Sequence, residues 1–511
     1  MTSRVLGVVR EQVLAALFGA GDATDAYNVA FRIPNLVRDL FAEGAMSSAF
    51  VPTFTRHLTT SGKDSAWRLG NLVINGLLVI TAGLVILGIV FAEPLVELFA
   101  GAYRDVPGKI ELTVFLTRLM LPFLTFVAVA AAFMGMLNSL HRFFIPALSP
   151  AMFNVATIVC AVVLVPLMPA LGLPGITAIA VGTLVGGAAQ LALQWPSLRR
   201  EGFSYRPLLD WRDESFTRVL VLMGPGTIGL AATQVNVLVN TVLATGEGTG
   251  AVSWLNYAFR LMYLPIGLSG VSIATATLPA VSRYVAMRDE RAARTTVADG
   301  LSMMLVLNIP ATVGLMALAP SIVRLIFERG AFTAADTAAT AAAVQFYAIG
   351  LVGYSVVRIT SPVFYALGQN RTPVMVSVAT VLTNALLNVW LVGLMGYRGL
   401  ALGTSIAALV NGALLMFFLR RRLGGIEGGR VSASLARIAI AAAIMGVAAV
   451  ATDVGTGLWI PGDGLAPQLI RLTTTIGVAV GVLAASAYLL RVREFREAVT
   501  LVTRKLRIGS R

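Results

Sequence analysis

Residues 28–52 decide the fold, and they read NVAFRIPNLVRDLFAEGAMSSAFVP. The stretch is long and apolar enough for a membrane helix, yet it contains Arg32, Arg38, Asp39 and Glu43. A charged side chain at the centre of a bilayer costs about 2.5 to 3.5 kcal/mol on insertion scales, so such residues usually line a polar, water-filled interior. Arginines at this depth therefore predict a transporter with a cationic cavity for an anionic passenger.

The composition of the whole chain indicates a membrane protein. The chain has 511 residues, of which 57% are hydrophobic and 13% charged, and its mean hydropathy is +0.82. The formal net charge is +14, but the basic residues form short clusters between apolar runs, so we expect no nucleic-acid partner. The single cysteine, Cys160, excludes an internal disulfide and a cysteine metal site.

Apolar runs long enough to cross about 30 Å of hydrocarbon predict an all-α polytopic protein with about fourteen transmembrane helices. The first run has no small-residue cleavage pattern, so we expect no cleavable signal peptide. The predicted spans are residues 2–18, 25–55, 68–99, 110–140, 145–168, 174–196, 216–245, 251–282, 296–327, 337–368, 373–395, 398–419, 434–453 and 467–490.

Lysine and arginine are concentrated in alternate links between these spans. They are frequent in the links at 199–212 and 420–430, whereas the links at 168–174, 245–250 and 453–464 contain none. Basic loops stay on the cytoplasmic side of a membrane. The pattern therefore predicts a multi-pass membrane protein with both termini in the cytoplasm.

The sequence repeats itself at a separation of roughly 225 to 230 residues. The run NVAFR at 28–32 recurs as NYAFR at 256–260, and LNSLHRFFIP at 137–146 is echoed by LGQNRTP at 367–373. An even number of helices separates the copies, so the halves are predicted to be parallel repeats with the substrate between them.

This duplication predicts two lobes of six helices followed by two helices without a repeat partner. The predicted divisions are an N-terminal lobe at 1–200, a C-terminal lobe at 201–430, the two extra helices at 431–495 and a basic cytoplasmic tail at 496–511.

Arginines inside the predicted helices are the candidate ligands for the passenger. Arg4 and Arg10 lie in the first helix, Arg38 in the second and Arg260 in the eighth. Guanidinium groups bind phosphate in a bidentate way, which favours a diphosphate headgroup over an organic cation. Structural ion pairs, such as one between Arg4 and Glu11 on one helix face, and snorkelling to the interface are the alternative interpretations.

A second group of polar residues consists of neutral side chains in apolar runs. Its members are Asn240 in helix 7, Asn384 and Asn388 in helix 11, and Thr404 in helix 12. Their oxygens can coordinate a hard cation, although interhelical hydrogen bonding is the more common use of such residues. No nucleotide-binding loop or hydrolase motif is present, so we expect a transporter and not an enzyme.

The runs SRVLGVVRE, FGAGDATDAY, AFRIPNLVRDLFAEGAMSSAFVP and, far downstream, SWLNYAFRLMYLP resemble the MurJ (MviN) family of lipid II flippases. The resemblance extends over essentially the whole chain. It implies the two-lobed fold of the multidrug/oligosaccharidyl-lipid/polysaccharide (MOP) exporter superfamily, with a V-shaped cationic cavity and a groove for the polyprenyl tail at helices 13 and 14.

The resemblance also assigns roles to individual residues. It implies that Arg4, Arg10, Arg38 and Arg260 hold the substrate and that Asp25 is an acid of the cavity. The sodium-binding positions of some members correspond to Asn240, Asn384, Asn388 and Thr404, where asparagines replace acids. No firm metal site follows, and the expected coupling ion is a monovalent cation, Na⁺ or H⁺, with no other cofactor.

The sequence therefore predicts a flippase for lipid II, the undecaprenyl-diphosphate-linked disaccharide-pentapeptide used in peptidoglycan and cell wall biogenesis. The expected partners are this lipid, membrane lipids, and cell-wall synthesis or division proteins. Two alternatives remain: an exporter of another lipid-linked polysaccharide or of a drug cation, and a scaffold that recruits cell-wall enzymes without transport.

Overall fold

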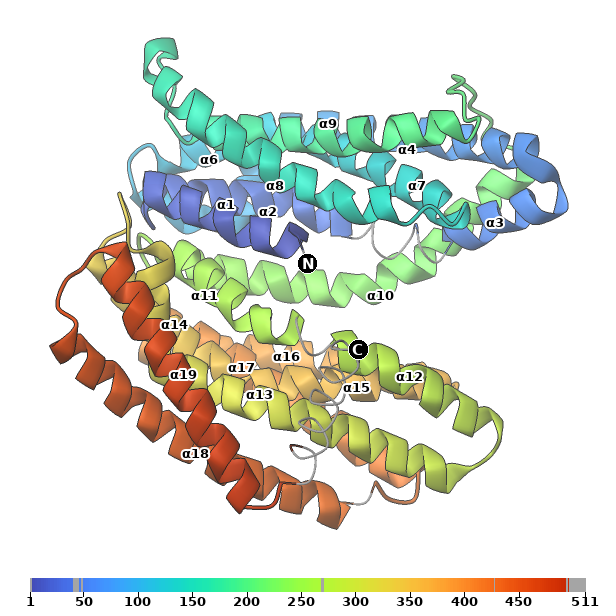
Figure 1. Cartoon of the computed structure of the whole chain (residues 1–511). Coiled ribbons are helices and arrows are strands. Elements are labelled where there is room, and N and C mark those ends of the chain that lie inside the picture. The colour runs from blue at the N-terminus through green and yellow to red at the C-terminus, as the bar shows by residue number, and fades with distance from the viewer. Residues whose placement is uncertain are drawn as a thin grey trace, which may run out of the picture. The chain divides into compact units, whose positions relative to one another are not determined.

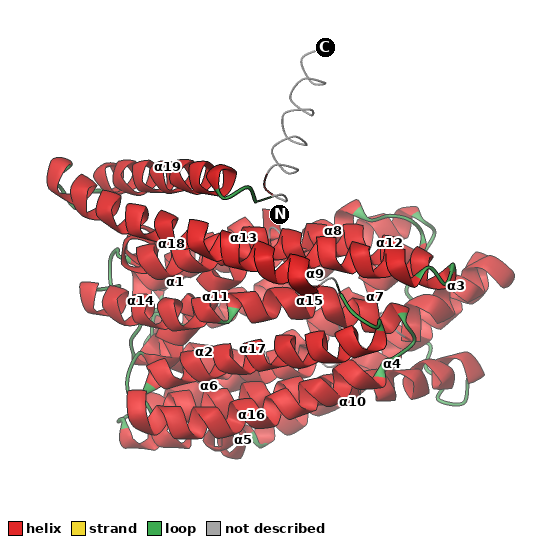
Figure 2. Cartoon of the chain, turned by 90° about the horizontal axis from the view of Figure 1, so that it is seen from below, coloured by secondary structure: helices red, strands yellow, loops and turns green. Residues whose placement is uncertain are grey.

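The computed structural model describes residues 2–39, 46, 49–267, 271–426, 428–492 and 495, and every regular element among them is a helix (Figure 2). The side chains of 2, 224–233, 271, 272, 274–276 and 430 are outside this description. So are Glu43 and the predicted tail at 496–511. The predicted all-α membrane fold is confirmed: within the described ranges, nine helices are long and apolar enough to cross a membrane, or ten if one bent pair counts as a span.

The chain forms two compact units. Unit 1 comprises Met1–Ser253 and Arg329–Phe332, and unit 2 comprises Trp254–Glu328 and Thr333–Arg511. The two units divide within helix α11 (Ala251–Pro265). The lobes expected from the duplication, 1–200 and 201–430, remain a prediction.

The helices of unit 1 lie at the blue-to-green end of the colour scale (Figure 1). They are α1 (Thr2–Phe18), α2 (Asp22–Arg38), α3 (Val51–Thr60), α4 (Gly62–Val90), α5 (Ala92–Ala100), η2 (Gly101–Asp105), α6 (Lys109–Met120), α7 (Phe123–Ser139), α8 (Phe144–Leu164), η3 (Val165–Leu167), η4 (Pro169–Leu171), α9 (Thr177–Arg200) and α10 (Glu214–Thr245).

Unit 2 contains most of α11 and the remaining helices. They are α12 (Val271–Ala286), α13 (Glu290–Phe327), α14 (Ala334–Ile349), α15 (Leu351–Ala366), α16 (Arg371–Met395), α17 (Tyr397–Arg422), α18 (Gly428–Trp459) and α19 (Leu465–Leu489).

Several predicted spans consist of two consecutive helices, which hydropathy alone did not reveal. The helices α14 and α15 meet at an angle of 41° across Gly350, and α6 gives way to α7 at Leu121 and Pro122. Proline has no N–H to donate, so it interrupts the helical hydrogen bonds. Such breaks are tolerated in a membrane because neighbouring helices satisfy the freed backbone groups.

The packing of unit 1 recurs in unit 2. In unit 1, α9 packs against α8 and α7, and α3 packs against α4; in unit 2, α17 packs against α16 and α15, and α12 packs against α13. The α15–α17 crossing is very close, since a Cβ at Gly353 would lie 2.4 Å from the Ala408 carbonyl. Small residues permit this approach of helices in a membrane. The recurrence is what a duplicated half predicts.

The link between α9 and α10 is fixed to α4. The Asn71 amide accepts from the backbone N–H of Arg206 at 2.8 Å and donates to the carbonyl of Ser204 at 3.1 Å. Phe203 is buried and contacts the ring of Trp67 edge-on, with 5.3 Å between centroids. This link is therefore an ordered part of unit 1.

The last two helices pack on the rest of unit 2, with α18 along α13 and α19 along α18 (Figures 1 and 2). Buried apolar side chains join them, such as Leu318 of α13, Met445 of α18 and Leu472 of α19. The Ser321 hydroxyl also donates to an Asp453 carboxylate oxygen at 2.7 Å. These helices are therefore an integral layer of unit 2.

Candidate functional site

Arg10 is buried in unit 1 and paired with its neighbour in sequence. It is 8% exposed and its Nη2 lies 2.5 Å from Oε1 of Glu11, which is 4% exposed. The guanidinium carbon also lies 5.1 Å from the centre of the Phe153 ring on α8. Glu11 therefore pairs with Arg10, and the local positive charge on α1 is partly neutralised.

Arg38 has a similar arrangement at the end of α2. Its Nη2 and Nε both donate to Oδ1 of Asp39, at 2.6 Å and 3.0 Å. Each of these side chains is 33% exposed, so the pair is reachable from solvent. The positive charge of Arg38 is therefore partly balanced by its neighbour in sequence.

Arg260 is exposed on α11 of unit 2, and Arg4 is exposed on α1 of unit 1. Aromatic side chains flank Arg260. Phe259 stacks on Tyr263 with 5.8 Å between ring centroids and meets Tyr347 of α14 edge-on at 5.5 Å. Arg260 is thus an exposed side chain beside aromatic rings of α11 and α14.

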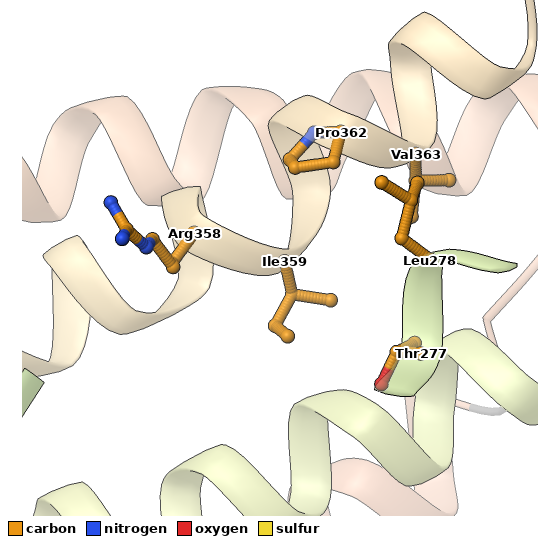
Figure 3. A pocket seen from close by; sticks show the side chains of 6 residues that line it. All are labelled: Thr277, Leu278, Arg358, Ile359, Pro362 and Val363. Atoms are coloured by element: carbon orange, nitrogen blue, oxygen red, sulfur yellow. The ribbon is translucent and has the colours of Figure 1, made fainter. Parts of the chain in front are cut away.

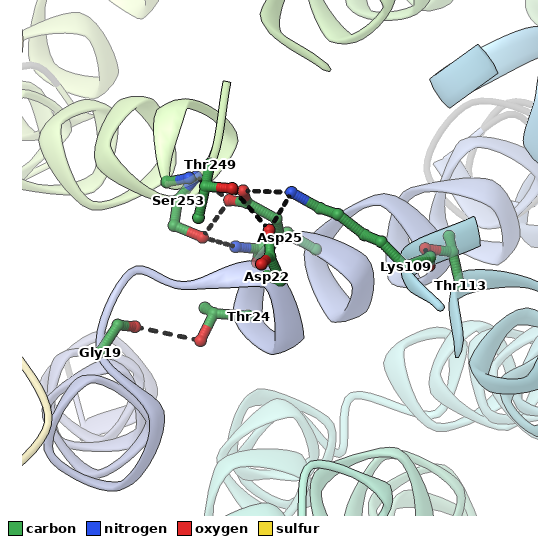
Figure 4. A network of polar contacts seen from close by, with 10 residues as sticks. Gly19, Asp22, Thr24, Asp25, Lys109, Thr113, Thr249 and Ser253 are labelled. Atoms are coloured by element: carbon green, nitrogen blue, oxygen red, sulfur yellow. Dashed lines mark hydrogen bonds and ion pairs between the residues drawn. The ribbon is translucent and has the colours of Figure 1, made fainter. Parts of the chain in front are cut away.

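Asp25 is fully buried at the first turn of α2, within a network of donors (Figure 4). Its Oδ1 accepts from the N–H of Ser253 at 3.0 Å and from its hydroxyl at 2.7 Å. Its Oδ2 accepts from the N–H of Gly250 at 2.7 Å and from Nζ of Lys109 at 3.1 Å. Asp25 therefore caps the beginning of α11, where unsatisfied N–H groups favour an anion.

Lys109 completes this network and was not predicted from sequence. It is 3% exposed, its Nζ lies 2.7 Å from Oδ1 of Asp22, and it lies 4.1 Å from the centre of the Tyr103 ring. The two partners Asp25 and Lys109 are 84 residues apart, so no local pattern signals their contact. Both oxygens of the Asp25 carboxylate therefore accept hydrogen bonds from groups of the protein itself.

Three of the four residues of the predicted ion site lie together in unit 2. Nδ2 of Asn388 donates to Oδ1 of Asn384 at 2.9 Å, and Nδ2 of Asn384 donates to the Thr404 hydroxyl at 3.5 Å, from α16 to α17. Both asparagines are buried. The fourth residue, Asn240, lies on α10, which belongs to unit 1. The Asn388–Asn384 bond lies within α16 and the Asn384–Thr404 bond joins α16 to α17, and interhelical hydrogen bonding was the alternative use of these residues.

Arg358 is a further arginine at membrane depth that the prediction did not include. It lies in the apolar run of α15 and is exposed. Among the residues that the structure describes, none forms a hydrogen bond or an ion pair with it. Tyr354, one helical turn earlier, is an electrostatic neighbour of Tyr263 on α11. Within unit 2, the segment of α11 at Tyr263 therefore lies near the segment of α15 at Tyr354.

Comparison with known protein families shows to which family the chain belongs. The sequence profile described as "Lipid II flippase MurJ" matches residues 14–467. The chain belongs to the MurJ lipid II flippase family. A MurJ relative, the "Probable lipid II flippase MurJ" of Vibrio cholerae, is 34% identical over 504 residues, which cover 96% of this chain and 94% of the relative. The "Lipid II flippase MurJ" of Burkholderia cenocepacia is 35% identical over 426 residues, covering 83% and 82% of the two chains.

Solved structures support the same family and its wider fold. The structure titled "Lipid II flippase MurJ, inward closed conformation" matches with a TM-score of 0.77 and 27% identity, covering 96% of this chain and 97% of that chain. An inward-facing multidrug resistance MATE transporter of the MOP superfamily matches with a TM-score of 0.69 and 16% identity, covering 83% and 96%. The second likeness concerns the fold alone. The expected MurJ family and MOP superfamily fold are confirmed.

Proposed function

We propose that this protein flips lipid II, the undecaprenyl-diphosphate-linked disaccharide-pentapeptide, from the cytoplasmic to the outer leaflet of the bacterial plasma membrane. The observation that carries this proposal is the match to MurJ relatives over 96% of the chain. The accessible arginines at membrane depth support it independently, because they suit an anionic headgroup better than a cationic drug.

In this proposal Arg260, which is exposed on α11 of unit 2, binds the diphosphate by bidentate, charge-assisted hydrogen bonds. Arg10 and Arg38 add positive charge that Glu11 and Asp39 moderate. Asp25 stabilises the fold and does not bind the substrate, because its carboxylate already accepts four hydrogen bonds from residues of unit 1.

We place the polyprenyl tail on the outer surface of α18 and α19. Large apolar side chains are exposed there, including Val447 at 72%, Leu458 at 78% and Val480 at 56%. An apolar chain can lie along such a surface within the bilayer while the headgroup stays with the arginines. The charge pattern of the links supports cytoplasmic positions for both termini.

Alternating access driven by a monovalent cation would complete the cycle. Inward-facing and outward-facing states are named for related MOP transporters. The Asn384, Asn388 and Thr404 cluster offers neutral oxygens, which do not titrate near neutral pH, so it fits Na⁺ better than H⁺. Flipping that is independent of a sodium gradient would remove this cluster from the mechanism.

Depletion tests the function directly. In a strain whose flippase is depleted, the labelled lipid-linked precursor should accumulate in the cytoplasmic leaflet, and this chain should restore its appearance outside. An Arg260→Ala variant should fail to restore it, whereas Arg371→Ala, a change of an exposed residue at the start of α16, should succeed.

The rival functions give different outcomes. A scaffold without transport would rescue growth equally well with Arg260→Ala. An exporter of drug cations would be inhibited by those cations in reconstituted vesicles and would leave the precursor in the cytoplasmic leaflet. Either result would overturn the proposal.

A further inference from the structure

Two exposed arginines of membrane helices, Arg358 and Arg118, have no ion-pair partner among the residues that the structure describes. Arg358 on α15 extends away from the hollow between α12 and α15 (Figure 3), and this hollow of about 10 Å³ has room for about one water molecule. Arg118 on α6 has a different setting, because large apolar side chains of unit 1 are exposed beside it. It therefore presents a cation to the surroundings of unit 1.

The guanidinium of Arg118 lies against the end of α4. Its Nε donates to the carbonyl of Ile89 at 3.3 Å, in the last turn of α4, where carbonyl groups lack helical partners. This long bond uses one of the five N–H donors of a guanidinium. Within the described part of the chain, no group accepts from the other donors. They are available to an anion from outside the protein.

The surface around Arg118 is apolar. Phe115, nearly one turn earlier on α6, is 39% exposed, and Ile86 and Val90, on either side of Ile89 on α4, are 62% and 64% exposed. Exposed apolar side chains of a membrane-spanning helix contact the hydrocarbon chains of lipids. A guanidinium beside hydrocarbon is costly unless it reaches the headgroups or binds an anion.

The length of the span places Arg118 near the headgroups. The span Lys109–Ser139 has 31 residues, or about 46 Å at 1.5 Å per residue, against about 30 Å of hydrocarbon. Centring it in the bilayer leaves about 8 Å outside at each end, so the Cα of Arg118 lies about 5 Å inside the hydrocarbon. Helical side chains point toward the N-terminus, here the nearer end, so the guanidinium reaches the level of the lipid phosphates.

An acid lies on the same face of α6, closer to the water. Glu111 is exposed and lies about two turns before Arg118, and none of the described residues forms an ion pair with it. The two residues are about 10 Å apart along the axis, and both side chains lean in the same direction. Hydrogen bonds of about 2.8 Å at each end leave roughly 5 Å, which a phosphate joined to an ammonium can fill.

We propose that this face of unit 1 binds an aminophospholipid of the surrounding bilayer, with Arg118 holding the phosphodiester and Glu111 the primary ammonium. The acyl chains contact Ile86, Val90 and Phe115. A primary ammonium donates hydrogen bonds to a carboxylate, whereas choline cannot and phosphatidylglycerol has no cation, so the lipid that fits is phosphatidylethanolamine. The charge pattern of the links predicts that this end of α6 lies on the outer side. The site does not depend on which molecule the protein transports.

The test places a fluorescent label at this face in vesicles that contain the full chain. Cys160→Ala removes the single cysteine, and Phe115→Cys then provides the thiol for a bimane label. The vesicles consist of phosphatidylcholine with an increasing fraction of phosphatidylethanolamine, phosphatidylglycerol or diacylglycerol that carries a nitroxide on an acyl chain. The fraction that quenches half of the fluorescence measures the affinity of each lipid for this face.

Phosphatidylethanolamine should quench at a fraction about tenfold lower than diacylglycerol, which lacks the phosphate, and about threefold lower than phosphatidylglycerol. Arg118→Gln should bring phosphatidylethanolamine close to diacylglycerol. Arg118→Lys, which keeps the charge, should retain most of the preference, so that a loss with glutamine is not due to misfolding. Glu111→Gln should remove only the difference between phosphatidylethanolamine and phosphatidylglycerol.

The matched control is Arg104→Gln on η2, which packs against α6. Arg104 is 62% exposed and pairs with Glu97, so this change should leave the order of the lipids as it is. With Arg118 and Glu111 intact, equal quenching by diacylglycerol or by phosphatidylglycerol would overturn the proposal, and so would equal effects of Arg104→Gln and Arg118→Gln. If an unlabelled lipid-linked precursor displaces phosphatidylethanolamine at an equal concentration, the face belongs to the transport path and the proposal fails.

Discussion

Unit 1 and unit 2 both carry polar side chains at membrane depth, but they surround them differently. In unit 1, Arg10 lies against Glu11, Arg38 against Asp39, and Asp25 against Lys109. In unit 2, the sequence neighbours of Arg260 and Arg358 are apolar and both arginines are exposed. Apart from tyrosines, the buried polar side chains that the structure describes there are neutral serines, threonines and asparagines. In unit 1, an oppositely charged group of the protein therefore lies against each of these side chains, whereas in unit 2 the two arginines are exposed beside apolar sequence neighbours.

The largest expected effect concerns the buried pair of unit 1. Lys109→Met should destabilise the protein by about 3 to 5 kcal/mol, because it leaves Asp25 buried without its cation. Thermal unfolding of the detergent-purified protein measures this loss. Adding Asp25→Asn to Lys109→Met should recover only part of the stability, since the uncompensated charge is gone but the amide nitrogen then faces the backbone N–H of Gly250 or of Ser253.

The control for this prediction is an exposed ion pair of the same unit. Arg104 is 62% exposed and pairs with Glu97, so Arg104→Met should cost less than about 1 kcal/mol. Equal losses for Lys109→Met and Arg104→Met would show that burial does not strengthen the polar contacts of unit 1.

A smaller effect is expected at the neutral cluster of unit 2. A Cβ on Gly403 would lie 2.0 Å from Oδ1 of Asn388. Gly403→Ala should therefore cost about 1 to 3 kcal/mol through overpacking and loss of the amide pairing. Gly393→Ala on α16, where a Cβ meets nothing within 4 Å, should be neutral or slightly stabilising. A stable Gly403→Ala protein would mean that the α16–α17 crossing is loose.

The smallest effect concerns a charge of unit 1 outside the membrane. A hydrogen bond from Arg142 at 2.7 Å, together with Lys63 nearby, lowers the pKa of Glu201 below its ordinary value of 4.5. A carboxyl whose pKa is lower in the folded state adds stability above its unfolded pKa, and this stability is lost as the pH falls through the folded pKa.

Glu201→Gln should therefore lower the unfolding temperature at about pH 7 by an amount worth less than about 1 kcal/mol, and the difference from the wild type should shrink near pH 3. Thermal unfolding at both pH values checks this. A difference that grows on acidification would contradict the assignment of Glu201 to the Arg142 pair.

Much of the fold could be predicted from hydropathy, because membrane helices are long apolar runs. The predicted first span, 2–18, coincides with α1, and the predicted seventh span ends with α10 at residue 245. The bend at Gly350 was not predicted, since α14 and α15 are both apolar and differ only in direction. Helix breaks depend on how neighbours satisfy the backbone, which composition does not record.

The candidate site, too, was predicted from the sequence only in part. Arginines within apolar runs are visible in sequence, and Arg358 carries the same signal as Arg260, although it was not selected. The contact of Lys109 with Asp25 depends on how α2 and α6 pack, and the pairing of Glu11 with Arg10 depends on rotamers that face Phe153. Sequence shows where a charge lies along a helix, and packing decides whether an acid of the protein reaches it.

The most direct test of the central claim is the flipping rate of the lipid-linked precursor in vesicles containing Arg260→Gln, with Arg371→Gln as the matched control. We predict a loss of about tenfold or more for Arg260→Gln, partial activity for Arg260→Lys, and the wild-type rate for Arg371→Gln. A wild-type rate for correctly inserted Arg260→Gln would contradict the claim that Arg260 binds the diphosphate.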